Sequence, residues 1–196
     1  MRVRIIPEDY PNDRFILKPI VTAMFAHLEK PSVQIDVHSP RVSGWDAVKS
    51  IDQIREIIAK FPTVHLFLRC VDRDGHRERR RILDDLESRV RKVLPPPRLF
   101  LAEHAWQEIE VWALAGIEWK LKPRWTWEAI RTAPDPKERF FEPVAKDRGL
   151  LNSPGRGREQ LGAEAAGNYA KVRQNCRELR ELETRIGQWL HRSGLA

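Results

Sequence analysis

Two aspartates one residue apart, Asp72 and Asp74, follow a run of mainly apolar residues from Val64 to Val71. Such a run is typical of a strand that is covered on both faces, as in a parallel sheet. The two acids then lie beyond the carboxyl end of the strand, where open α/β sheets bind ligands. Two carboxylates that close together both stay ionised only beside a cation, and a divalent metal ion is the simplest such cation.

A third acid, Glu8, follows the first apolar strand, Val3 to Ile6, and so takes an equivalent position at a strand end. Mg²⁺ and Mn²⁺ prefer oxygen ligands, and Mg²⁺ keeps several of its waters, so three carboxylates at two neighbouring strand ends suit either ion. The sequence therefore predicts a metal site formed by Glu8, Asp72 and Asp74. The alternative is that the aspartates are turn and helix-cap residues and that Glu8 is a solvated side chain.

Other sites that contain closely spaced acids fit this sequence less well. A helix-loop-helix calcium site needs glycine at loop position six, whereas Gly75 is at position four of the run that starts at Asp72. A phosphatase with an aspartyl nucleophile carries its acid pair after the first strand. The histidines have neither the spacing nor the neighbouring cysteines of a zinc site.

The elements that must position these acids alternate between strand and helix along residues 1–117. Apolar patterns predict strands at residues 3–6, 33–37, 64–71 and 99–102, each followed by an amphipathic helix, the first of them capped by Asp13. This alternation predicts an α/β domain with a Rossmann-like, four-stranded, mainly parallel sheet flanked by helices. If Glu8 meets the aspartate pair, the first and third strands are neighbours, and the strand order is 2-1-3-4.

The rest of the chain has a different character. The stretch 118–143 is rich in Trp, Pro, Lys and Arg and predicts an irregular arm, whose tryptophans either stack on bases or pack a core or hinge. Glycines between residues 148 and 167 predict a mobile basic loop. Residues 168–196 carry apolar residues at spacings of three and four, which predicts an amphipathic helix that packs on the domain or on a partner.

Charge and composition limit the function classes. The 196-residue chain has 35 Lys and Arg against 28 Asp and Glu, a formal net charge of +7 that suggests a polyanionic partner without separating nucleic acid from a membrane surface or an acidic protein. No apolar run reaches the length of a membrane span or forms a signal peptide. Cys70 and Cys176 have no C-x-x-C spacing and predict core residues in a reducing cytoplasm.

The order of the motifs resembles the TOPRIM domain of topoisomerases, primases and the overcoming-lysogenisation-defect nucleases. The likeness consists of a lone glutamate after strand one (Glu8), a glycine-containing loop after strand two (Ser43–Gly44) and Asp-x-Asp after strand three. Asp9 stands where the commoner pattern has glycine. Further segments, Glu108–Ala115 and those near Tyr169 and Cys176, are similar to stand-alone TOPRIM-like proteins often encoded beside an ABC-type ATPase.

The resemblance implies that Glu8, Asp72 and Asp74 bind Mg²⁺ or Mn²⁺ and that Glu108 or Glu110 serves a second metal. We assign Glu110 to the metal and Glu108 to the catalytic set, and helical spacing predicts that at most one of the two faces the crevice. Related nucleases also use a lysine, for which the candidates are Lys146 and Lys171. Two metal ions would stabilise the attacking and leaving oxygens of a phosphodiester.

The implied activity is metal-dependent cleavage of nucleic acid by the partner of an ABC-type ATPase in antiviral defence; DNA is the first expectation for the substrate and RNA the alternative. Guanidinium groups are expected to contact phosphates or, by the alternative, to form a solvated face; these are Arg77, Arg80, Arg156, Arg158 and Arg173. A second hypothesis is a non-catalytic TOPRIM-like module that docks on an ATPase or on nucleic acid. A third is a hydrolase of small nucleotides. For the oligomeric state, the sequence allows either a monomer or a homo-oligomer.

Overall fold

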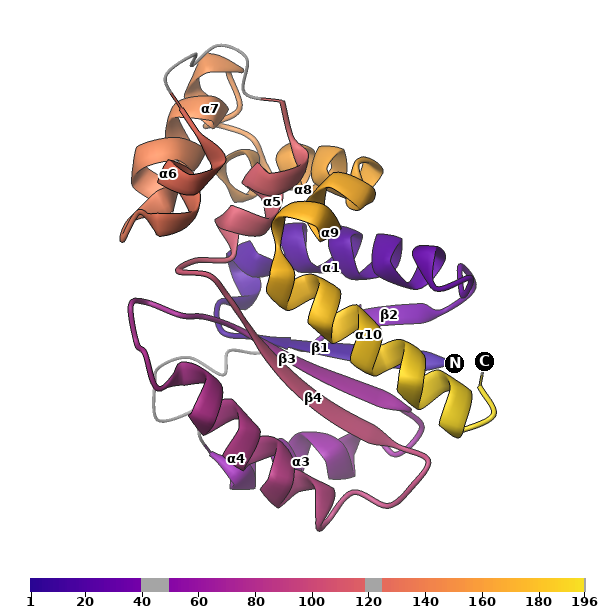
Figure 1. Ribbon diagram of the computed structural model, residues 1–196. Helices are drawn as coiled ribbons and strands as arrows, with labels where there is room; N and C mark the ends of the chain where they lie inside the picture. The colour runs from indigo at the N-terminus through magenta and orange to yellow at the C-terminus, as the bar shows by residue number, and fades with distance from the viewer. Residues whose placement is uncertain (40–49, 119–124, 196) are drawn as a thin grey trace.

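The computed structural model describes residues 1–39, 50–118 and 125–195, and its centre is a four-stranded parallel sheet (Figure 1). The strands lie in the order β2-β1-β3-β4, and each neighbouring pair is parallel. Their bounds are Arg2–Pro7 for β1, Gln34–Val37 for β2, Leu66–Asp72 for β3 and Leu99–Ala105 for β4. The predicted α/β class and the 2-1-3-4 strand order are confirmed, and the arrangement is Rossmann-like.

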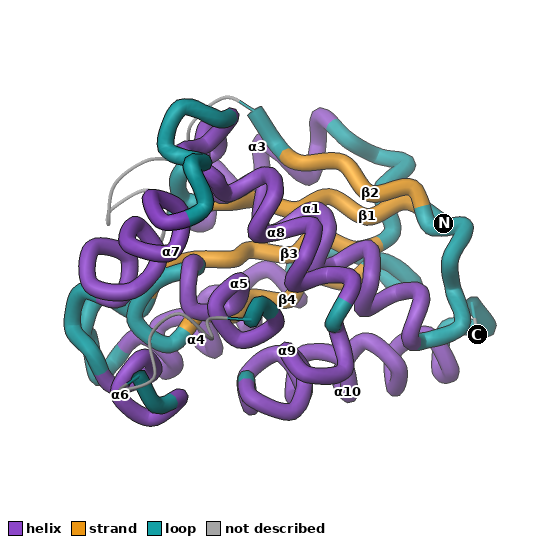
Figure 2. Tube along the Cα trace, turned by 90° about the horizontal axis from the view of Figure 1, so that it is seen from above, coloured by secondary structure: helices purple, strands orange, loops and turns teal. Residues whose placement is uncertain are grey.

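Helices cover both faces of the sheet (Figures 1 and 2). One face carries α3 (Ile51–Lys60) and α4 (Arg79–Arg91). The other carries α1 (Tyr10–His27), α5 (Glu110–Gly116) and the helices near the C-terminus. Because each face is covered, the central strands bury side chains on both sides, as a parallel sheet requires.

Side chains of β3 alternate between the two layers. Leu66 and Leu68 pack in the larger core cluster with α1 and α5, whereas Phe67 and Val71 pack in the smaller cluster with α3 and α4. All four side chains are at most 1% exposed. The prediction that this strand is buried on both faces is therefore confirmed.

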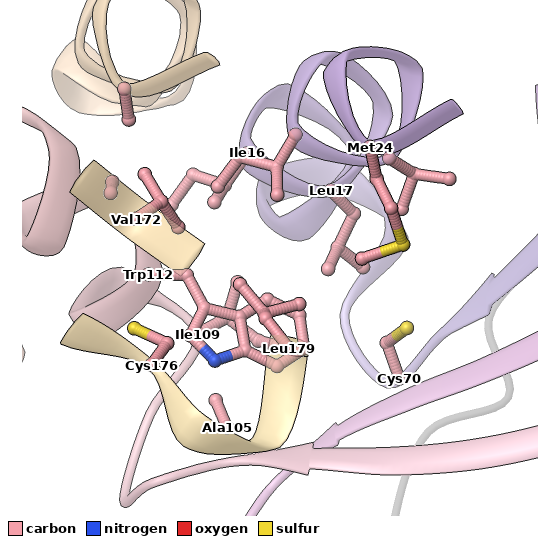
Figure 3. Close-up of a cluster of buried hydrophobic side chains, with 14 of the residues drawn as sticks. Ile16, Leu17, Met24, Cys70, Ala105, Ile109, Trp112, Val172, Cys176 and Leu179 are labelled. Atoms are coloured by element: carbon pink, nitrogen blue, oxygen red, sulfur yellow. The ribbon is translucent and has the colours of Figure 1, made fainter. Parts of the chain in front are cut away.

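The larger cluster is centred on Trp112 of α5, which lies among side chains of α1 and the C-terminal helices (Figure 3). Its indole is fully buried and its Nε1–H donates to Glu178 Oε1 at 3.0 Å. This hydrogen bond satisfies the one polar atom of the indole, which a buried tryptophan requires. The C-terminal helices and the sheet domain thus share one core.

Most of the segment between residues 125 and 167 is helical, so the predicted irregular arm is wrong there, and the predicted glycine-rich loop over residues 148–167 is found only as turns over residues 148–157. The helical pieces are α6 (Trp127–Thr132), the π-helix η1 (Lys137–Phe141), α7 (Glu142–Asp147), the 3-10 turn η2 (Pro154–Gly157) and α8 (Arg158–Gly167). Trp125 packs edge-on against Phe140, with ring centroids 4.9 Å apart, in agreement with the packing interpretation of the tryptophans. Trp119 lies outside the described residues.

Glycine misled the prediction for α8 because one glycine of this helix serves close packing. Leu161 and Ala165 of α8 are fully buried in the larger core cluster. Between them, Gly162 lies so near α1 that a Cβ there would meet the Phe15 carbonyl oxygen at 2.3 Å. The absent side chain allows the two helices to approach closely.

We therefore expect Gly162→Ala to lower the free energy of unfolding by about 2–3 kcal/mol, because backbone atoms of α1 must move to admit the methyl group. Gly167→Ala is the matched control in the same helix, since a Cβ there meets nothing within 4 Å. That control is expected to change stability by less than about 1 kcal/mol. Urea denaturation measures both, and equal effects of the two substitutions would contradict the close-packing role.

The C-terminal segment forms two helices, α9 (Tyr169–Asn175) and α10 (Arg177–Arg192), where one was predicted. The chain leaves the helical conformation at Cys176, with φ −105° and ψ 96°. The apolar residues along α9 and α10, here called the C-terminal seam, are buried within the monomer; they are Tyr169, Val172, Cys176, Leu179, Leu182, Ile186 and Trp189. The seam therefore packs on the sheet domain and is not exposed as a partner surface.

Helix α10 also closes the outer edge of β4. The backbone N–H of Ala102 donates to Glu87 Oε1 of α4 at 2.7 Å, and Arg185 of α10 pairs with the same carboxylate. Trp189 Nε1–H donates to the Pro97 carbonyl oxygen at 2.8 Å. Side chains from α4 and α10 thus cover the strand edge.

Within the described residues, no helix has the length and apolar character needed to cross a membrane.

Candidate functional site at the carboxyl end of the sheet

The turns after β1 and β3 meet at the carboxyl end of the sheet. The register pairs Pro7 with Cys70, so Glu8 comes next to the last residues of β3. The backbone N–H of Asp72 hydrogen-bonds the Glu8 carboxylate, and Asp74 interacts electrostatically with both Glu8 and Asp72. The strand order therefore brings the predicted acids to one rim, as expected. The predicted Ser43–Gly44 loop lies outside the described residues.

The acids nevertheless face different layers, because successive side chains of a strand point to opposite sides. Glu8 lies beside Arg69 and Arg79, on the side of α3 and α4. Asp72 lies beside Asp13 and Glu110, on the side of α1 and α5. The side chains of Glu8 and Asp72 thus diverge from adjacent strand ends.

On the α3 and α4 side, arginines balance the acids. Burial raises the pKa of the Glu8 carboxyl, and the positive charges of Arg69 and Arg79 oppose that rise. Asp74 Oδ2 accepts a hydrogen bond from Arg79 Nη2 at 3.1 Å. Its backbone is left-handed, with φ 50°, a conformation that aspartate tolerates better than most residues.

On the other side, Asp72 lines a cleft of ≈ 370 Å³ in which acids predominate. Its acids are Asp9, Asp13, Asp72, Glu108, Glu110, Glu138 and Glu142, and its bases are Lys137, Arg156 and Arg158. Burial raises the pKa of Asp72 well above its ordinary value, and the negative charges of Asp13 and Glu110 add to the effect. Burial also raises the pKa of Asp13 and of Glu108 to about 7. The cleft therefore holds more negative charge than its own bases neutralise.

Glu108 and Glu110 both line this cleft, so the prediction that at most one of them faces it is wrong. The reason is that α5 begins at Glu110, and Glu108 precedes the helix. Glu108 Oε2 accepts the backbone N–H of Lys137 at 2.8 Å. Glu110 Oε1 accepts from Arg158 Nε at 2.9 Å in a buried ion pair. In this structure Glu110 is a partner of Arg158.

Gln107 holds the Asp72–Gly75 turn in place. Its carbonyl oxygen accepts the backbone N–H groups of Arg73 and Asp74, at 2.7 and 3.1 Å, and its Oε1 accepts that of Gly75 at 3.0 Å. Asp72 Oδ1 in turn accepts the N–H of Ile109 at 2.7 Å. Gln107 itself has a left-handed backbone, with φ 74°. Nothing in the sequence pattern pointed to this residue.

Asp13 is a second residue that the sequence reasoning placed wrongly. The N-cap of α1 is Asp9, and Asp13 lies in the first turn, where its Oδ2 accepts the backbone N–H of Asp9 at 2.9 Å. A signal was present, since Asp13 is in helical register with the buried residues Ile16 and Ile20. An acid on a core-facing stripe needs a polar site to face.

Neither predicted catalytic lysine reaches the cleft. Lys171 Nζ–H donates to the Ile117 carbonyl oxygen at 3.1 Å, and Lys146 lines a separate groove on α7. The lysine among the described lining residues is Lys137, whose Nζ lies 2.9 Å from Glu138 Oε1. The geometry therefore does not support the assignments of Lys146 and Lys171, and the structure brings Lys137 to the cleft instead.

The predicted phosphate-binding arginines do not form one stripe. Arg80 pairs with Asp84 at 2.8 Å and with Glu103 at 3.0 Å, and Arg173 pairs with Glu183 at 2.6 Å. Arg77 is exposed on the turn before α4. Only Arg156 and Arg158 belong to the cleft. The other guanidinium groups lie elsewhere or serve structural pairs.

The side chains at this rim offer the kind of ligand that Mg²⁺ or Mn²⁺ prefers. The predicted triad of Glu8, Asp72 and Asp74 is nevertheless not arranged as a metal site in this structure. In the described ranges, no three His, Cys, Asp or Glu side chains are grouped so as to hold a metal ion. The available donors are carboxylate oxygens, which Mg²⁺ and Mn²⁺ prefer. Glu8 Oε2 and Asp9 Oδ1 are buried without a hydrogen-bond partner. Asp9 lines the acid cleft, whereas Glu8 lies beside Arg69 and Arg79 on the other side of the rim, so the two orphaned oxygens are acceptors of the type that a divalent cation uses but do not form one site.

Asp13→Asn is expected to stabilise the folded protein more at pH 8 than at pH 5. Because burial raises the pKa of Asp13 to about 7, the folded state keeps this proton over a pH range in which the unfolded chain has released it. The carboxyl therefore lowers the free energy of unfolding as pH rises from about 4 to about 7. Asparagine keeps an oxygen acceptor for Asp9 and removes this loss.

Urea denaturation at the two pH values measures the effect of Asp13→Asn. Glu56→Gln, at an exposed position of α3, is the matched control for removal of one negative charge. A stability gain that is equal at pH 5 and pH 8 would contradict the buried-carboxyl explanation.

Comparison of the chain with protein-family models, curated proteins and solved structures gives no match. The comparisons therefore assign no family, and the functional argument rests on the residues and geometry of this rim.

Proposed function

We propose that this protein hydrolyses phosphodiester bonds of nucleic acid in a reaction that depends on Mg²⁺ or Mn²⁺. The observation that carries the proposal is the acid cleft at the carboxyl end of β3, where Asp72 lies among further carboxyl groups with raised pKa values. A cation is the partner that such a group of acids lacks. The order Glu8, Asp72, Asp74 along the sequence, which resembles TOPRIM nucleases, supports the same activity.

The chain's own residues divide the work in this proposal. Asp72 holds the metal ion in the acid cleft, where Asp9 and Asp13 offer further carboxylate oxygens. Glu8 faces the opposite layer and Asp74 pairs with Arg79, so neither belongs to this ligand set as the chain is folded here. When bound, the metal supplies Lewis-acid polarisation of the phosphate and lowers the pKa of water. Glu108, whose pKa is raised to about 7, is matched to accept a proton from water near neutral pH. Gln107 fixes the turn that carries the two aspartates.

Positive groups at the cleft are the proposed contacts for the nucleic-acid backbone. Lys137 and Arg156 line the cleft beside Glu138 and Glu142, at 2.9 and 3.5 Å, and the Arg156 side chain is 61% exposed. The net charge of +7 favours a polyanion. From the resemblance we further propose an ABC-type ATPase as the partner in antiviral defence. We take DNA as the first substrate to test, with RNA as the alternative, and the two free, buried cysteines favour a cytoplasmic location.

The test is cleavage of plasmid DNA, single-stranded DNA and RNA by the purified chain with Mg²⁺ or Mn²⁺, compared with an excess of EDTA. We expect cleavage with metal and none with EDTA. The double variant Glu8→Ala, Asp72→Ala is expected to be inactive while it keeps its circular dichroism spectrum. Equal activity of this variant and the wild type would reject the assigned site. Steep loss of binding with salt would support phosphate contacts over a small-nucleotide substrate.

One observation favours a second candidate, a non-catalytic module that binds nucleic acid or an ATPase. Arg79 pairs with Asp74, and Arg69 and Arg79 flank Glu8, so arginines already neutralise two of the three predicted metal ligands. Binding of Mn²⁺, followed by electron paramagnetic resonance, separates the two candidates. The module is the better description if the chain binds DNA but binds no Mn²⁺ and cleaves nothing. Docking would then use a surface other than the buried C-terminal seam.

A further inference from the structure

Arg69 of β3 is a fully buried arginine with an unused hydrogen-bonding edge. Its Nη1–H groups donate to the carbonyl oxygens of Ile6 and Pro7, at 3.2 and 2.6 Å, and its side chain is 0% exposed. Its Nε and Nη2 have no hydrogen-bond partner. These two nitrogens form one edge of the guanidinium, and that edge matches two oxygens of a phosphate or carboxylate.

An unused buried edge of a charged group calls for an explanation, since nearly all buried polar groups are paired. Burial lowers the pKa of Arg69 to about 10, so the group stays positively charged at neutral pH. A positive charge without a hydrogen-bonded counter-charge is unfavourable in the protein interior. An oxyanion on the free edge would satisfy both the charge and the two donors.

Charges of both signs surround Arg69. Glu8 and Asp13 act on it as negative charges and Arg79 as a positive one. On the other side of the cluster, the positive charges of Arg4, Lys60 and Arg69 act on His38, which follows β2. His38 is 7% exposed and its Nδ1 has no hydrogen-bond partner. Glu8 is the acid that faces both Arg69 and Arg79.

The place in the fold is one where ligands bind. Glu8 and His38 directly follow β1 and β2, and Arg69 lies in the adjacent strand β3, in register with Ile6. The order of the sheet reverses between β1 and β3, and open α/β sheets bind ligands at such a point. The cluster lies on the α3 and α4 side of the rim, whereas the acid cleft lies on the α1 and α5 side. It reaches solvent at Glu8, which is partly exposed, and next to Asp74, which pairs with the buried Arg79 and has a side chain that is 48% exposed.

We propose that Arg69 binds the oxyanion of a phosphate group through Nε and Nη2, with His38 and the charge of Arg79 completing the site. Glu8, the counter-charge in this structure, is the group that the anion displaces. The rim then offers a cation site and a phosphate site on its two sides, as phosphodiester chemistry requires. That the phosphate belongs to nucleic acid rests on the proposed function; the binding of phosphate itself does not.

The test is a titration of the full chain with inorganic phosphate in EDTA, followed by isothermal calorimetry. Arg69→Lys keeps the charge but removes the paired edge, and we expect it to weaken phosphate binding at least about tenfold. Arg98→Lys is the matched control, because Arg98 also donates to backbone carbonyls, from Nε to Val64 at 2.9 Å, at the opposite end of the sheet. That control is expected to bind phosphate as the wild type does.

A second measurement needs no substitution. In the wild-type protein, the Arg69 Nε–H resonance is expected to shift during the phosphate titration, while that of Arg98 does not. Absence of phosphate binding by the wild type, equal binding by wild type and Arg69→Lys, or equal loss in both variants would each overturn the proposal. An oligonucleotide with a 5′-phosphate that binds more tightly than its unphosphorylated form identifies a terminal phosphate, and equal binding identifies backbone phosphates.

The outcome is independent of the cleavage assay, because no metal is present. Phosphate binding that depends on Arg69, together with the absence of nuclease activity, would keep this site and remove the proposed hydrolysis. Cleavage without an effect of Arg69→Lys on phosphate binding would do the reverse.

Discussion

Asp72→Asn is expected to abolish metal-dependent cleavage and, at the same time, to make the protein more stable. A metal ion contributes several kcal/mol to a phosphodiester transition state, so loss of a ligand should lower the rate by at least about a hundredfold. Burial and the negative charges of Asp13 and Glu110 raise the pKa of Asp72, so its ionised form destabilises the metal-free fold. Asparagine removes that charge and keeps an oxygen acceptor for the Ile109 N–H.

Single-turnover cleavage and urea denaturation, both at pH 8 and the second in EDTA, measure the two effects of Asp72→Asn. The variant is expected to be more stable than the wild type, because burial and the negative charges of Asp13 and Glu110 raise the pKa of Asp72 and so disfavour its ionised form in the fold. Asp85→Asn, at an exposed position of α4, is the control and should change neither quantity. A variant that is less stable than the wild type in EDTA would show that Asp72 is a structural group, and undiminished cleavage would remove it from the site.

Arg158→Met is expected to lower the free energy of unfolding by about 3–5 kcal/mol, because it leaves the Glu110 carboxylate buried without its partner. The side chains of this pair are 8% and 7% exposed, and the carboxylate faces other acids of the cleft. The double variant Arg158→Met, Glu110→Gln should regain most of the loss, since no unpaired charge remains. Urea denaturation of the two variants gives the comparison.

An exposed pair provides the control for this experiment. Arg177 and Glu181 of α10 lie 2.6 Å apart with side chains 78% and 54% exposed, so Arg177→Met should cost less than about 1 kcal/mol. Urea denaturation of Arg158→Met in millimolar Mg²⁺ tests whether the metal ion replaces the missing positive charge beside Glu110. Recovery of Arg158→Met by Mg²⁺ would identify Glu110 as a metal ligand, whereas no recovery would leave it as a structural partner of Arg158.

The fold followed from the sequence because its signals are local. The apolar run of β3 and the half-apolar pattern of β2 identify a central and an edge strand, and right-handed crossovers then restrict the order of the sheet. The meeting of the turns after β1 and β3 followed from that order. In a parallel α/β sheet, the residues at the rim are those that follow the strand ends, and the strand ends can be predicted from the sequence.

The side of the sheet that each acid faces could not be read in the same way. Side chains alternate along a strand, so an error of one residue in a strand end moves a side chain to the opposite layer. Glu8 and Asp72 were therefore placed together although they face different layers. The pairing of Glu110 with Arg158, 48 residues apart, is a tertiary contact without a local pattern.

The position of α10 has a consequence for assembly. Edge strands invite pairing with another chain, and natural proteins block them with charged side chains or a covering helix. Here Glu87 occupies the Ala102 N–H and Arg185 anchors that carboxylate, so another strand cannot add to β4 at this point. A chain truncated before α10 would keep Glu87 of α4 on the Ala102 N–H but lose Arg185, which anchors that carboxylate, and Trp189. The edge of β4 would then be covered by α4 alone and should pair more readily with a strand of another chain.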